Sequence, residues 1–324
     1  MKRLITMTSN MKISRREFVK KTMAAGAAVA ATSLLGTSCK DIIAAEPGKG
    51  KRVIIFAFDG IRVDGLEQAN TPNIDALIAD GSVSFTTRVQ MPSMTLPNFT
   101  SHLCGAGPEI HGVVNNDWTK KHHTLDAVET DVDGYFPSVF RVLHDKGVKT
   151  AYYWGWQQLV YPLNQNCFDD KLLIADDNYP ALCDKAMEFI SANQSDDMFV
   201  FLYDCWPDEM GHQHNWMSQE YIQAIEQGDE QVGRVVAFLK EKGLYDDSHL
   251  MFITDHGGIH DSHGGVTPEE MIVPWVIAGP GIKKGFTIEE PNNTVNTAST
   301  VLRLFGYEQP LVWTGEVPES IFES

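Results

Sequence analysis

Apolar runs and amphipathic segments alternate along most of the chain. Five continuous apolar runs have the length of strands buried on both faces, and they lie at 49–60, 148–156, 197–204, 249–255 and 271–279. Amphipathic segments with helix start and stop signals lie at 71–81, 136–147, 179–194, 218–243 and 293–306. This alternation predicts an α/β fold with a mostly parallel central sheet and helices on both faces. Residues 115–135 and 156–180 fit it poorly, and we expect loops or a small cap there.

Length, composition and charge narrow the class of protein. The chain has 324 residues, 43% of them hydrophobic, which suffices for one large domain or two small ones. The formal net charge is −17 at pH 7. Such acidity disfavours a broad basic face, so we expect no binding to nucleic acid.

The first 38 residues predict an export signal rather than part of the fold. Residues 14–20 read SRREFVK, with the paired arginines of a twin-arginine signal, and a mildly apolar run follows at 22–36. The run ends in LLGTSC, where Cys39 resembles the lipid-acceptor cysteine of a lipoprotein. Two alternatives stay open: a membrane tether through a lipid on Cys39 and residues 39–51, or a plain signal peptide that is cut nearby. Both predict a protein of the periplasm or cell envelope.

The cysteines do not indicate a metal site, although two of them are candidates for a disulfide. Export permits disulfides, and of the four cysteines beyond Cys39 we expect Cys167 and Cys183 to pair. The chain has no CxxC motif, which disfavours a zinc site made of cysteines.

Three of the predicted strands are followed by aspartates, and histidines lie close behind two of these. The side chains are those of Asp59, Asp208, His212, Asp255, His256 and His263. They should converge, because ligands bind at the carboxyl ends of the strands in such sheets. A catalytic zinc takes about three protein ligands, so this set suits two divalent metal ions. The glycines beside His263 would let that loop turn around an ion.

Each of these residues, taken singly, is more often a turn residue, a helix cap or a solvated surface group. We interpret four neighbours in that way, or as partners that orient metal ligands: Asp204, His214, His260 and Asp261. Such separate explanations do not account for the set as a whole. Three acidic strand ends together with a histidine-rich glycine loop favour a metal centre.

A hydroxyl at a helix start adds a second element. Thr95 precedes the segment LPNFTSHL, which reads as the beginning of a helix. Free backbone N–H groups and the positive end of the helix dipole would receive a phosphoryl group there. From this segment alone, an N-cap is the safer interpretation of Thr95.

Together these motifs resemble the alkaline phosphatase superfamily and, within it, the type I phosphodiesterase/nucleotide pyrophosphatase family. The matching pieces are VIIFAFDGIRVD, MTLPNFTSHLCGAGPEIHGVVNN, DEMGH, ITDHG, and HGG followed by PWVIAGPGI, and they span Val53 to Ile282. The resemblance implies an alkaline phosphatase-like catalytic domain over 52–324 with two divalent metal ions, most simply Zn²⁺. It implies hydrolysis of a phosphodiester or nucleotide pyrophosphate through a covalent phosphothreonine.

The resemblance also implies a role for each matching residue. The metal site that activates the nucleophile would comprise Asp59, Thr95, Asp255 and His256. The second metal site would comprise Asp208, His212 and His263. Thr95 would be the covalent nucleophile. Asn116 would hydrogen-bond a non-bridging phosphate oxygen, with the backbone N–H of Thr95 or Leu96, and Asn115 is the fallback.

One departure from the family leaves the substrate open. His256 and His263 are seven residues apart, whereas nucleotide pyrophosphatases have a long insertion there. The short spacing is closer to phosphoethanolamine transferases and to some sulfatase-like members, although no CxPxR-like motif surrounds Thr95. No Arg or Lys adjoins Thr95, which favours a diesterase. The substrate is expected to be a small-molecule, lipid-linked or sugar-linked phosphoester. The alternatives are a phosphoethanolamine transferase, a phosphomonoesterase and, last, a non-enzymatic metal-stabilised envelope protein.

Overall fold

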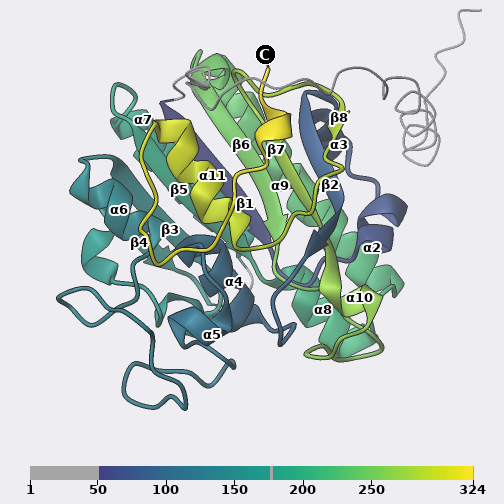
Figure 1. Ribbon diagram of the computed structural model, residues 1–324. Coiled ribbons are helices and arrows are strands. Elements are labelled where there is room, and N and C mark those ends of the chain that lie inside the picture. The colour runs from purple at the N-terminus through teal and green to yellow at the C-terminus, as the bar shows by residue number, and fades with distance from the viewer. Residues whose placement is uncertain (1–50, 176–177, 324) are drawn as a thin grey trace, which may run out of the picture. The chain divides into compact units, whose positions relative to one another are not determined.

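The computed structural model describes residues 51–175 and 178–323, and a sheet of eight strands runs through them (Figure 1). The strand order is β4-β3-β5-β1-β6-β7-β2-β8. β7 is antiparallel to both of its neighbours, and the other pairs are parallel. The predicted mostly parallel sheet is therefore confirmed. The strands are β1 (Arg52–Phe58), β2 (Gly81–Arg88), β3 (Lys149–Trp154), β4 (Asp170–Leu173), β5 (Met198–Asp204), β6 (Ser248–Thr254), β7 (Ile272–Ala278) and β8 (Phe286–Thr287).

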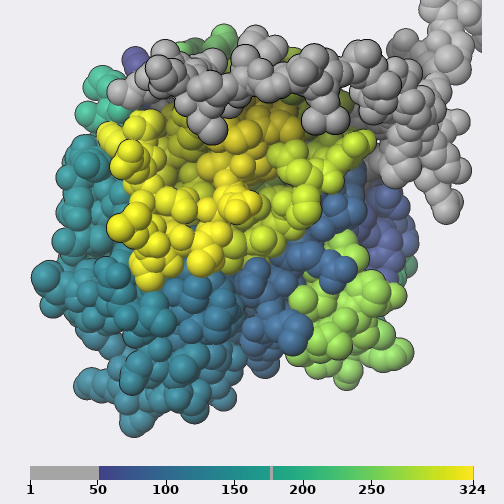
Figure 2. Space-filling model, viewed as in Figure 1, coloured from purple at the N-terminus to yellow at the C-terminus, as the bar shows by residue number. Residues whose placement is uncertain are grey.

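Helices cover both faces of the sheet, as predicted. They are α2 (Val63–Gln68), α3 (Pro72–Ala79), α4 (Thr95–Cys104), α5 (Pro108–His111), α6 (Val139–Asp145), α7 (Tyr179–Ala192), α8 (Trp206–His214), α9 (Gln219–Glu241), α10 (Pro268–Met271) and α11 (Asn296–Phe305). Short 3₁₀ helices are η2 (Gln157–Val160), η3 (Gln165–Cys167), η4 (Tyr245–Asp247) and η5 (Glu319–Ile321). Figure 1 shows α11 in front of the sheet and α9 behind it. The C-terminal part of the chain covers the middle of the front face (Figure 2).

The apolar run of β1 belongs to two cores at once. Val53, Ile55 and Ala57 pack on one face of the sheet with side chains of α4, α6 and α11. The alternate residues of the strand pack on the other face with α3, α7 and α9. This division follows from the two-residue period of a strand. It explains why the run has no polar positions.

β2 is an element that the hydrophobic pattern missed. Its sequence, GSVSFTTR, is rich in Ser and Thr, yet its first four residues are buried. Burial comes from its neighbours, because β2 pairs with β7 on one side and β8 on the other. Gly81, predicted as a helix stop, begins this strand. A Cβ atom there would lie 2.1 Å from the carbonyl oxygen of Ile277, so only glycine fits.

The predicted disulfide between Cys167 and Cys183 is wrong. Both cysteines are buried and free, as are Cys104 and Cys205. Cys167 belongs to the core that contains α4 and α6, whereas Cys183 lies in α7 and belongs to the core on the opposite face. The sheet separates the two thiols, which excludes a bond between them.

The two stretches that fitted the alternation poorly differ from each other. Residues 115–135 contain neither helix nor strand beyond an isolated bridge between Thr119 and His122, as expected for a loop. Residues 156–180 instead contain η2, η3 and the edge strand β4, which the pattern missed. The predicted export signal, Cys39 and nearly all of the tether lie outside the described residues. Within the described part of the chain, we find no helix with the length and hydropathy needed to cross a bilayer.

Candidate metal centre

Two strand ends bring a first group of potential ligands together. Phe58 of β1 pairs with Thr254 of β6, so the residues that follow them lie side by side. These are Asp59, Asp255 and His256, whose exposed fractions are 2%, 0% and 0%. His256 Nε2 lies 3.3 Å from Asp59 Oδ1 and 3.2 Å from Asp255 Oδ2. We call these three residues the first group.

The hydrogen bonds of the first group leave one oxygen of each carboxylate free. Asp59 Oδ2 accepts from the Tyr203 hydroxyl, and Asp255 Oδ1 accepts from the backbone N–H of Gly60 at 3.2 Å. Asp59 Oδ1 and Asp255 Oδ2 are buried and have no hydrogen-bond partner among the described residues. These are the same two oxygens that face His256.

The histidine presents a bare nitrogen to these oxygens. His256 Nδ1 lies 2.9 Å from the carbonyl oxygen of Gly257, which only accepts, so Nδ1 carries the proton of the neutral ring. Burial and the positive charge of His263 lower the pKa of His256 well below its usual value. A neutral Nε2 lone pair facing two carboxylate oxygens is repulsive unless a cation lies between them. The donor set therefore fits a divalent metal ion.

The carboxyl groups respond to burial in the opposite direction. Burial, followed by the negative charges of the neighbouring aspartates, raises the pKa values of Asp59 and Asp255 well above the usual range. Two carboxylates this close and this buried cannot both stay ionised without a compensating charge. A bound cation would supply that charge, and protons would otherwise take its place.

Thr95 adds a hydroxyl to the first group. It is the first residue of α4, and the N-cap position belongs to Met94, so Thr95 does not act as the cap. Its Oγ1 lies 3.2 Å from His256 Nε2. The side chain is 4% exposed and stands at the end of the helix that offers free N–H groups. The structure thus places a hydroxyl against the same His256 nitrogen that faces the two carboxylate oxygens.

Asn116 reaches the same helix start from the loop that follows α5. Its Oδ1 accepts from the backbone N–H of Leu96 at 2.9 Å. The expectation that Leu96 N–H faces the phosphate is therefore not supported, since Asn116 already occupies it. With Oδ1 engaged, the NH₂ of Asn116 remains as the donor. Asn115 instead accepts from Asp117 N at 3.1 Å in a local turn.

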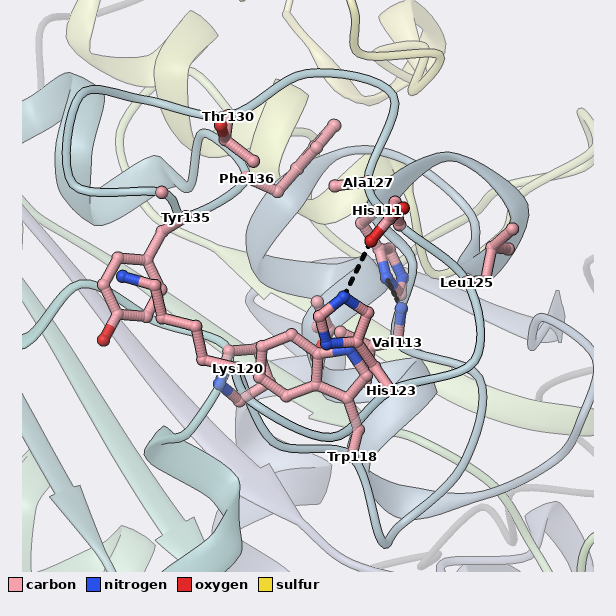
Figure 3. A pocket seen from close by; sticks show the side chains of 14 residues that line it. His111, Val113, Trp118, Lys120, His123, Leu125, Ala127, Thr130, Tyr135 and Phe136 are labelled. Atoms are coloured by element: carbon pink, nitrogen blue, oxygen red, sulfur yellow. Dashed lines mark hydrogen bonds and ion pairs between the residues drawn. The ribbon is translucent and has the colours of Figure 1, made fainter.

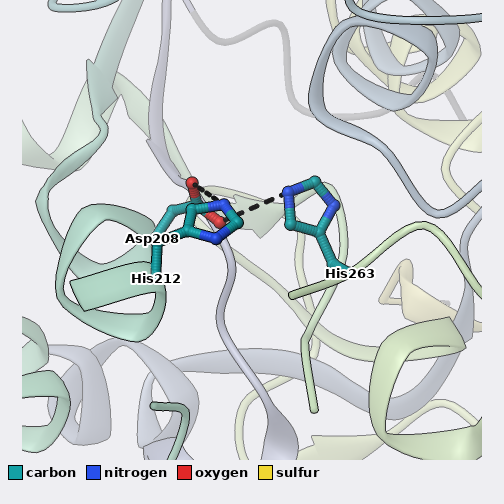
Figure 4. A group of neighbouring side chains, drawn as sticks. All are labelled: Asp208, His212 and His263. Atoms are coloured by element: carbon teal, nitrogen blue, oxygen red, sulfur yellow. Dashed lines mark ion pairs between the residues drawn. The ribbon is translucent and has the colours of Figure 1, made fainter. Parts of the chain in front are cut away.

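A second group of potential ligands comes from α8 and the glycine-rich loop. Asp208 and His212 stand one turn apart on α8, with His212 Nε2 3.3 Å from Asp208 Oδ2. His263 Nε2 lies 3.8 Å from Asp208 Oδ1, which is buried and has no hydrogen-bond partner among the described residues. Figure 4 shows the ion pairs that join Asp208 to the two imidazole rings. We call these three residues the second group.

Backbone carbonyl oxygens orient both histidines of the second group. His212 Nδ1 lies 2.8 Å from the carbonyl oxygen of Asp261, and His263 Nδ1 lies 2.9 Å from that of Ser93. Each ring therefore turns Nε2 toward Asp208, which is the arrangement of metal-ligating histidines. Without a cation, the hydrogen bond to Asp208 raises the pKa of His212 to about 9. Burial opposes ionisation of Asp208, but hydrogen bonding to His212 and nearby histidine charge lower its pKa overall.

The two groups adjoin each other. The rings of His256 and His263 stack with centroids 3.7 Å apart and planes 15° apart. In the described part of the chain, the ion pairs of these six side chains are with one another, and none involves Lys or Arg. The centre thus combines three carboxylates and three imidazoles with no basic side chain to neutralise them.

Several contacting residues were not predicted from the sequence. Tyr203 donates to Asp59, Ser93 supplies the carbonyl for His263, and Trp216 packs beside the second group. Two of the other neighbours singled out in the sequence, Asp204 and His260, contribute backbone carbonyls. The carbonyl of Asp204 accepts from Asp59 N at 2.9 Å, and the carbonyl of His260 accepts from Trp216 N at 2.7 Å. Nothing in the sequence pattern distinguishes residues whose carbonyl oxygens accept in this way from other loop residues.

A cavity of about 340 Å³ lies under the loop that follows Asn116 (Figure 3). Its wall includes Thr100 of α4 and, from the loop, Trp118, Lys120, His123 and Tyr135. The Trp118 and His123 rings stack with centroids 5.7 Å apart, and Lys120 Nζ lies 4.1 Å from the centroid of the Tyr135 ring. The indole N–H of Trp118 is buried and has no partner among the described residues. The wall of the cavity is thus largely aromatic.

The chain is similar in sequence to known phosphodiesterases. A family model described as type I phosphodiesterase/nucleotide pyrophosphatase matches residues 53–271. Ectonucleotide pyrophosphatase/phosphodiesterase family member 3 of Mus musculus is 25% identical over 219 residues, which cover 63% of this chain and 24% of that protein. Venom phosphodiesterase of Macrovipera lebetinus is 26% identical over 242 residues, which cover 70% of this chain and 28% of that protein. The matched part is about a quarter of the length of these relatives.

Solved structures share the fold. Murine ectonucleotide pyrophosphatase/phosphodiesterase 5, in an inactive form in complex with AMP, has a TM-score of 0.70 at 16% identity, covering 85% of this chain and 100% of that chain. Ps i-CgsB in complex with k-i-k-neocarrahexaose has a TM-score of 0.66 at 18% identity, covering 83% and 74%. At such identities the likeness concerns the arrangement of sheet and helices.

Proposed function

Because this chain belongs to the type I phosphodiesterase/nucleotide pyrophosphatase family, we propose that it hydrolyses phosphodiesters at a centre for two divalent cations. The observation that carries the proposal is the set of three buried, unpartnered carboxylate oxygens, each facing a histidine Nε2. The hydroxyl of Thr95 lies 3.2 Å from Nε2 of one of these histidines, His256. Groups of about three nitrogen and oxygen ligands suit Zn²⁺ and leave positions open for substrate.

The proposed chemistry begins at Thr95. Two bound cations would supply positive charge that lowers the pKa of the Thr95 hydroxyl and offsets the charge on the departing oxygen. Thr95 Oγ1 loses its proton to solvent and bonds to phosphorus, while the bond from phosphorus to the leaving alkoxide breaks and that alkoxide takes up a proton. Water then bonds to phosphorus as the Oγ1–P bond breaks, which restores the hydroxyl. The intermediate is a phosphothreonine.

Neutral donors hold the phosphoryl group in this proposal. The NH₂ of Asn116 is free because its Oδ1 accepts from Leu96 N. The backbone N–H of Thr95 stands at the first position of α4, where it lacks a partner within the helix. Neither donor carries a charge, and no Lys or Arg pairs with the ligands in the described part of the chain. This suits the single negative charge of a diester better than the two charges of a monoester.

The cavity beside α4 is the proposed place for the organic part of the substrate. Trp118, which lines it, follows Asn116 by two residues, and Thr100 stands five residues along α4 from Thr95, roughly 7.5 Å at the rise of a helix. Aromatic walls suit a ring that can stack on them, such as a sugar or a base. Trp118→Ala should therefore raise KM for ring-bearing diesters while leaving KM for bis-p-nitrophenyl phosphate unchanged. Equal effects on both substrates would remove this assignment.

A hydrolysis panel tests the proposed reaction. With zinc added, bis-p-nitrophenyl phosphate and nucleotide p-nitrophenyl esters should be cleaved faster than p-nitrophenyl phosphate, and p-nitrophenyl sulfate should not be cleaved. Thr95→Ala should reduce turnover by several orders of magnitude with little change in zinc content, because it removes the covalent step. Thr95→Ser restores a hydroxyl and should retain measurable activity. A Thr95→Ala protein with near-normal turnover would overturn the phosphothreonine.

The proposed location is the cell envelope, on the sequence evidence of residues 14–20 and Cys39. Replacing Arg15 and Arg16 together by Lys should retain the protein in the cytoplasm, because the export receptor reads the paired arginines. Cys39→Ser should release it from the membrane fraction if Cys39 carries a lipid. Fractionation identical to that of the wild type in either case would contradict the corresponding signal.

A further inference from the structure

Trp216 packs directly against the second group. Its indole is 5% exposed and meets the imidazole of His212 edge-on, with ring centroids 5.0 Å apart and planes 84° apart. It also meets His263, with centroids 6.0 Å apart and planes 68° apart. One aromatic side chain therefore contacts both histidines that turn Nε2 toward Asp208. Such edge-to-face contacts restrict the planes of both rings.

The backbone on both sides of Trp216 adopts a conformation that L-residues rarely take. Asn215 has φ 76° and ψ 146°, and Met217 has φ 70°. For residues with a side chain, positive φ is unfavourable, and the region occupied by Asn215 is almost restricted to glycine. Strain of this kind persists only where surrounding contacts hold it, and it concentrates at functional sites. Here the two strained residues enclose the tryptophan that contacts the second group.

A slot made by glycines accepts the indole. A Cβ atom at Gly211 would lie 2.7 Å from an indole carbon, and one at Gly258 would lie 2.2 Å from it, so neither position tolerates a side chain. The indole N–H donates to the carbonyl of Gly60 at 2.9 Å. The backbone N–H of Trp216 donates to the carbonyl of His260, which itself has φ 55°. The ring is therefore held at its plane, at its polar end and at its backbone.

We propose that Trp216 is a positioning residue that fixes the ring planes of His212 and His263 for the second cation. This role rests on the proposed metal centre. The two histidines need such support, because the His212 side chain is 39% exposed near the end of a short helix and His263 stands in a glycine-rich loop. The carbonyl oxygens of Asp261 and Ser93 orient Nδ1 of each ring. Contact with the indole adds a further restraint on both rings.

Another buried tryptophan provides a matched control. Trp313 is 4% exposed, donates its indole N–H to the carbonyl of Pro137 at 3.0 Å, and would lie 2.5 Å from a Cβ atom at Gly105. It therefore shares with Trp216 the burial, the carbonyl partner and the glycine contact. It packs in the core on the opposite face of the sheet and contacts neither group. Loss of packing should affect both positions alike, whereas a positioning role should affect Trp216 alone.

The experiment compares Trp216→Phe, Trp216→Leu and Trp313→Phe in the full chain. Zinc is titrated into the metal-free proteins in competition with a chromophoric chelator, and the thermal unfolding midpoint of each metal-free protein is measured. We expect Trp216→Phe to weaken the weaker of two zinc sites by roughly 10- to 100-fold, as is typical when the support of a ligand is lost. Trp216→Leu, which removes the ring edge altogether, should weaken it further. The tighter site should keep its affinity in both variants.

The control separates positioning from stability. Trp313→Phe should lower the unfolding midpoint as much as Trp216→Phe does, and its two zinc affinities should equal those of the wild type. Wild-type affinity at both sites in Trp216→Leu, or in Trp216→Phe if the Leu variant does not fold, would overturn the positioning role. So would an equal loss in Trp313→Phe. A wild-type protein that binds no zinc would instead overturn the proposed metal centre, and this role with it.

Discussion

The first and second groups contain similar ligands but are built differently. Asp59, Asp255 and His256 are at most 2% exposed and directly follow two adjacent strands. In the second group, the His212 side chain is 39% exposed, and its ligands come from a helix and a loop. The first group thus directly continues two strands of the sheet, whereas the second group is formed by a helix and a loop.

This difference determines what holds each group in place. The backbone pairing of β1 with β6 places the first group, and any change there must also disturb two buried strands. The second group depends on individual contacts, namely the carbonyls that orient its histidines and the indole of Trp216. We therefore expect the first group to be rigid and essential for turnover. The second group should be more easily emptied by a single substitution.

The largest effect is expected from breaking the first group at Asp255. Asp255→Asn keeps the shape of the side chain and an acceptor for Gly60 N–H but removes the negative charge. Turnover of bis-p-nitrophenyl phosphate should fall by several orders of magnitude, and zinc content should fall as well. Steady-state kinetics and elemental analysis of the purified variant measure both. Asp261→Asn is the matched control, since Asp261 contributes its backbone carbonyl to the site. Normal turnover in Asp255→Asn would show that the first group is not the reaction centre.

Emptying the second group alone is the next test. His263→Ala removes one of its three ligands, so zinc content should fall from about two ions per chain to about one. The first group should retain its ion, because none of its ligands changes. His214→Ala is the control, being an exposed histidine at the end of the same helix as His212. Loss of both ions in His263→Ala would contradict the independence of the two groups, which share a stacked pair of rings.

A smaller effect is expected at Asn116, which acts on the substrate side of the first group. Asn116→Ala removes the free NH₂ and the acceptor for Leu96 N–H. Loss of one donor to a developing oxyanion lowers kcat by about 100-fold in other enzymes. We expect a decrease of that order with unchanged zinc content. Asn115→Ala changes the neighbouring residue, whose side chain accepts from Asp117 N, and should keep kcat within a few-fold of the wild type. Equal decreases in both variants would assign the loss to the loop rather than to Asn116.

The comparison also shows which features a sequence reveals. Asp59 and Asp255 were foreseen because a continuous apolar run identifies a buried strand, and parallel strands place the residues after them at one edge. Asn116 came from the resemblance of the motif and not from any local pattern. The position of His263 depends on a loop whose path no periodicity describes. The structure brings it to Asp208, at 3.8 Å.

The remaining features arise from contacts between distant segments. β2 carries Ser and Thr and is buried only because β7 and β8 flank it. The N-terminus of α3 is capped by the carboxylate of Asp229 in α9, which accepts from Ile74 N at 2.7 Å, although Thr71 occupies the N-cap position. The expected pairing of Cys167 with Cys183 failed because it ignored the sheet between them. Such partners are far apart in sequence, so propensity and spacing carry no information about them.

Histidines outside the metal centre differ from His212 in the direction of their pKa shifts. We call α4, α5 and β6 the frame of the first group, and they contain the buried His102, His111 and His249. Burial lowers the pKa values of these three histidines to about 4, 3 and 4. In the second group, the hydrogen bond to Asp208 raises the pKa of His212 to about 9 in the absence of a cation. Burial in the frame therefore lowers the proton affinity of its histidines, whereas Asp208 raises the proton affinity of His212. Low pH should therefore reduce the free energy of unfolding of the frame, and protons should compete with the cation of the second group.

The smallest effect we predict concerns the frame at His249. The folded pKa is about 4 and the ordinary value 6.5, so below pH 6.5 the unfolded chain binds a proton that the folded chain does not. His249 thus reduces the free energy of unfolding as pH falls from 6.5 to about 4, by at most about 1.4 kcal/mol per pH unit, and has no such effect above pH 6.5. His249→Gln removes this contribution, so the loss of stability between pH 7 and pH 5 should be shallower in the variant. Urea unfolding of the metal-free proteins at a series of pH values measures the two slopes. His122→Gln, at an exposed position, is the control for replacing a histidine by glutamine. Parallel curves for His249→Gln and the wild type would mean that burial in the frame does not lower the pKa of His249. The two groups would then differ in exposure and not in the proton affinity of the histidines around them.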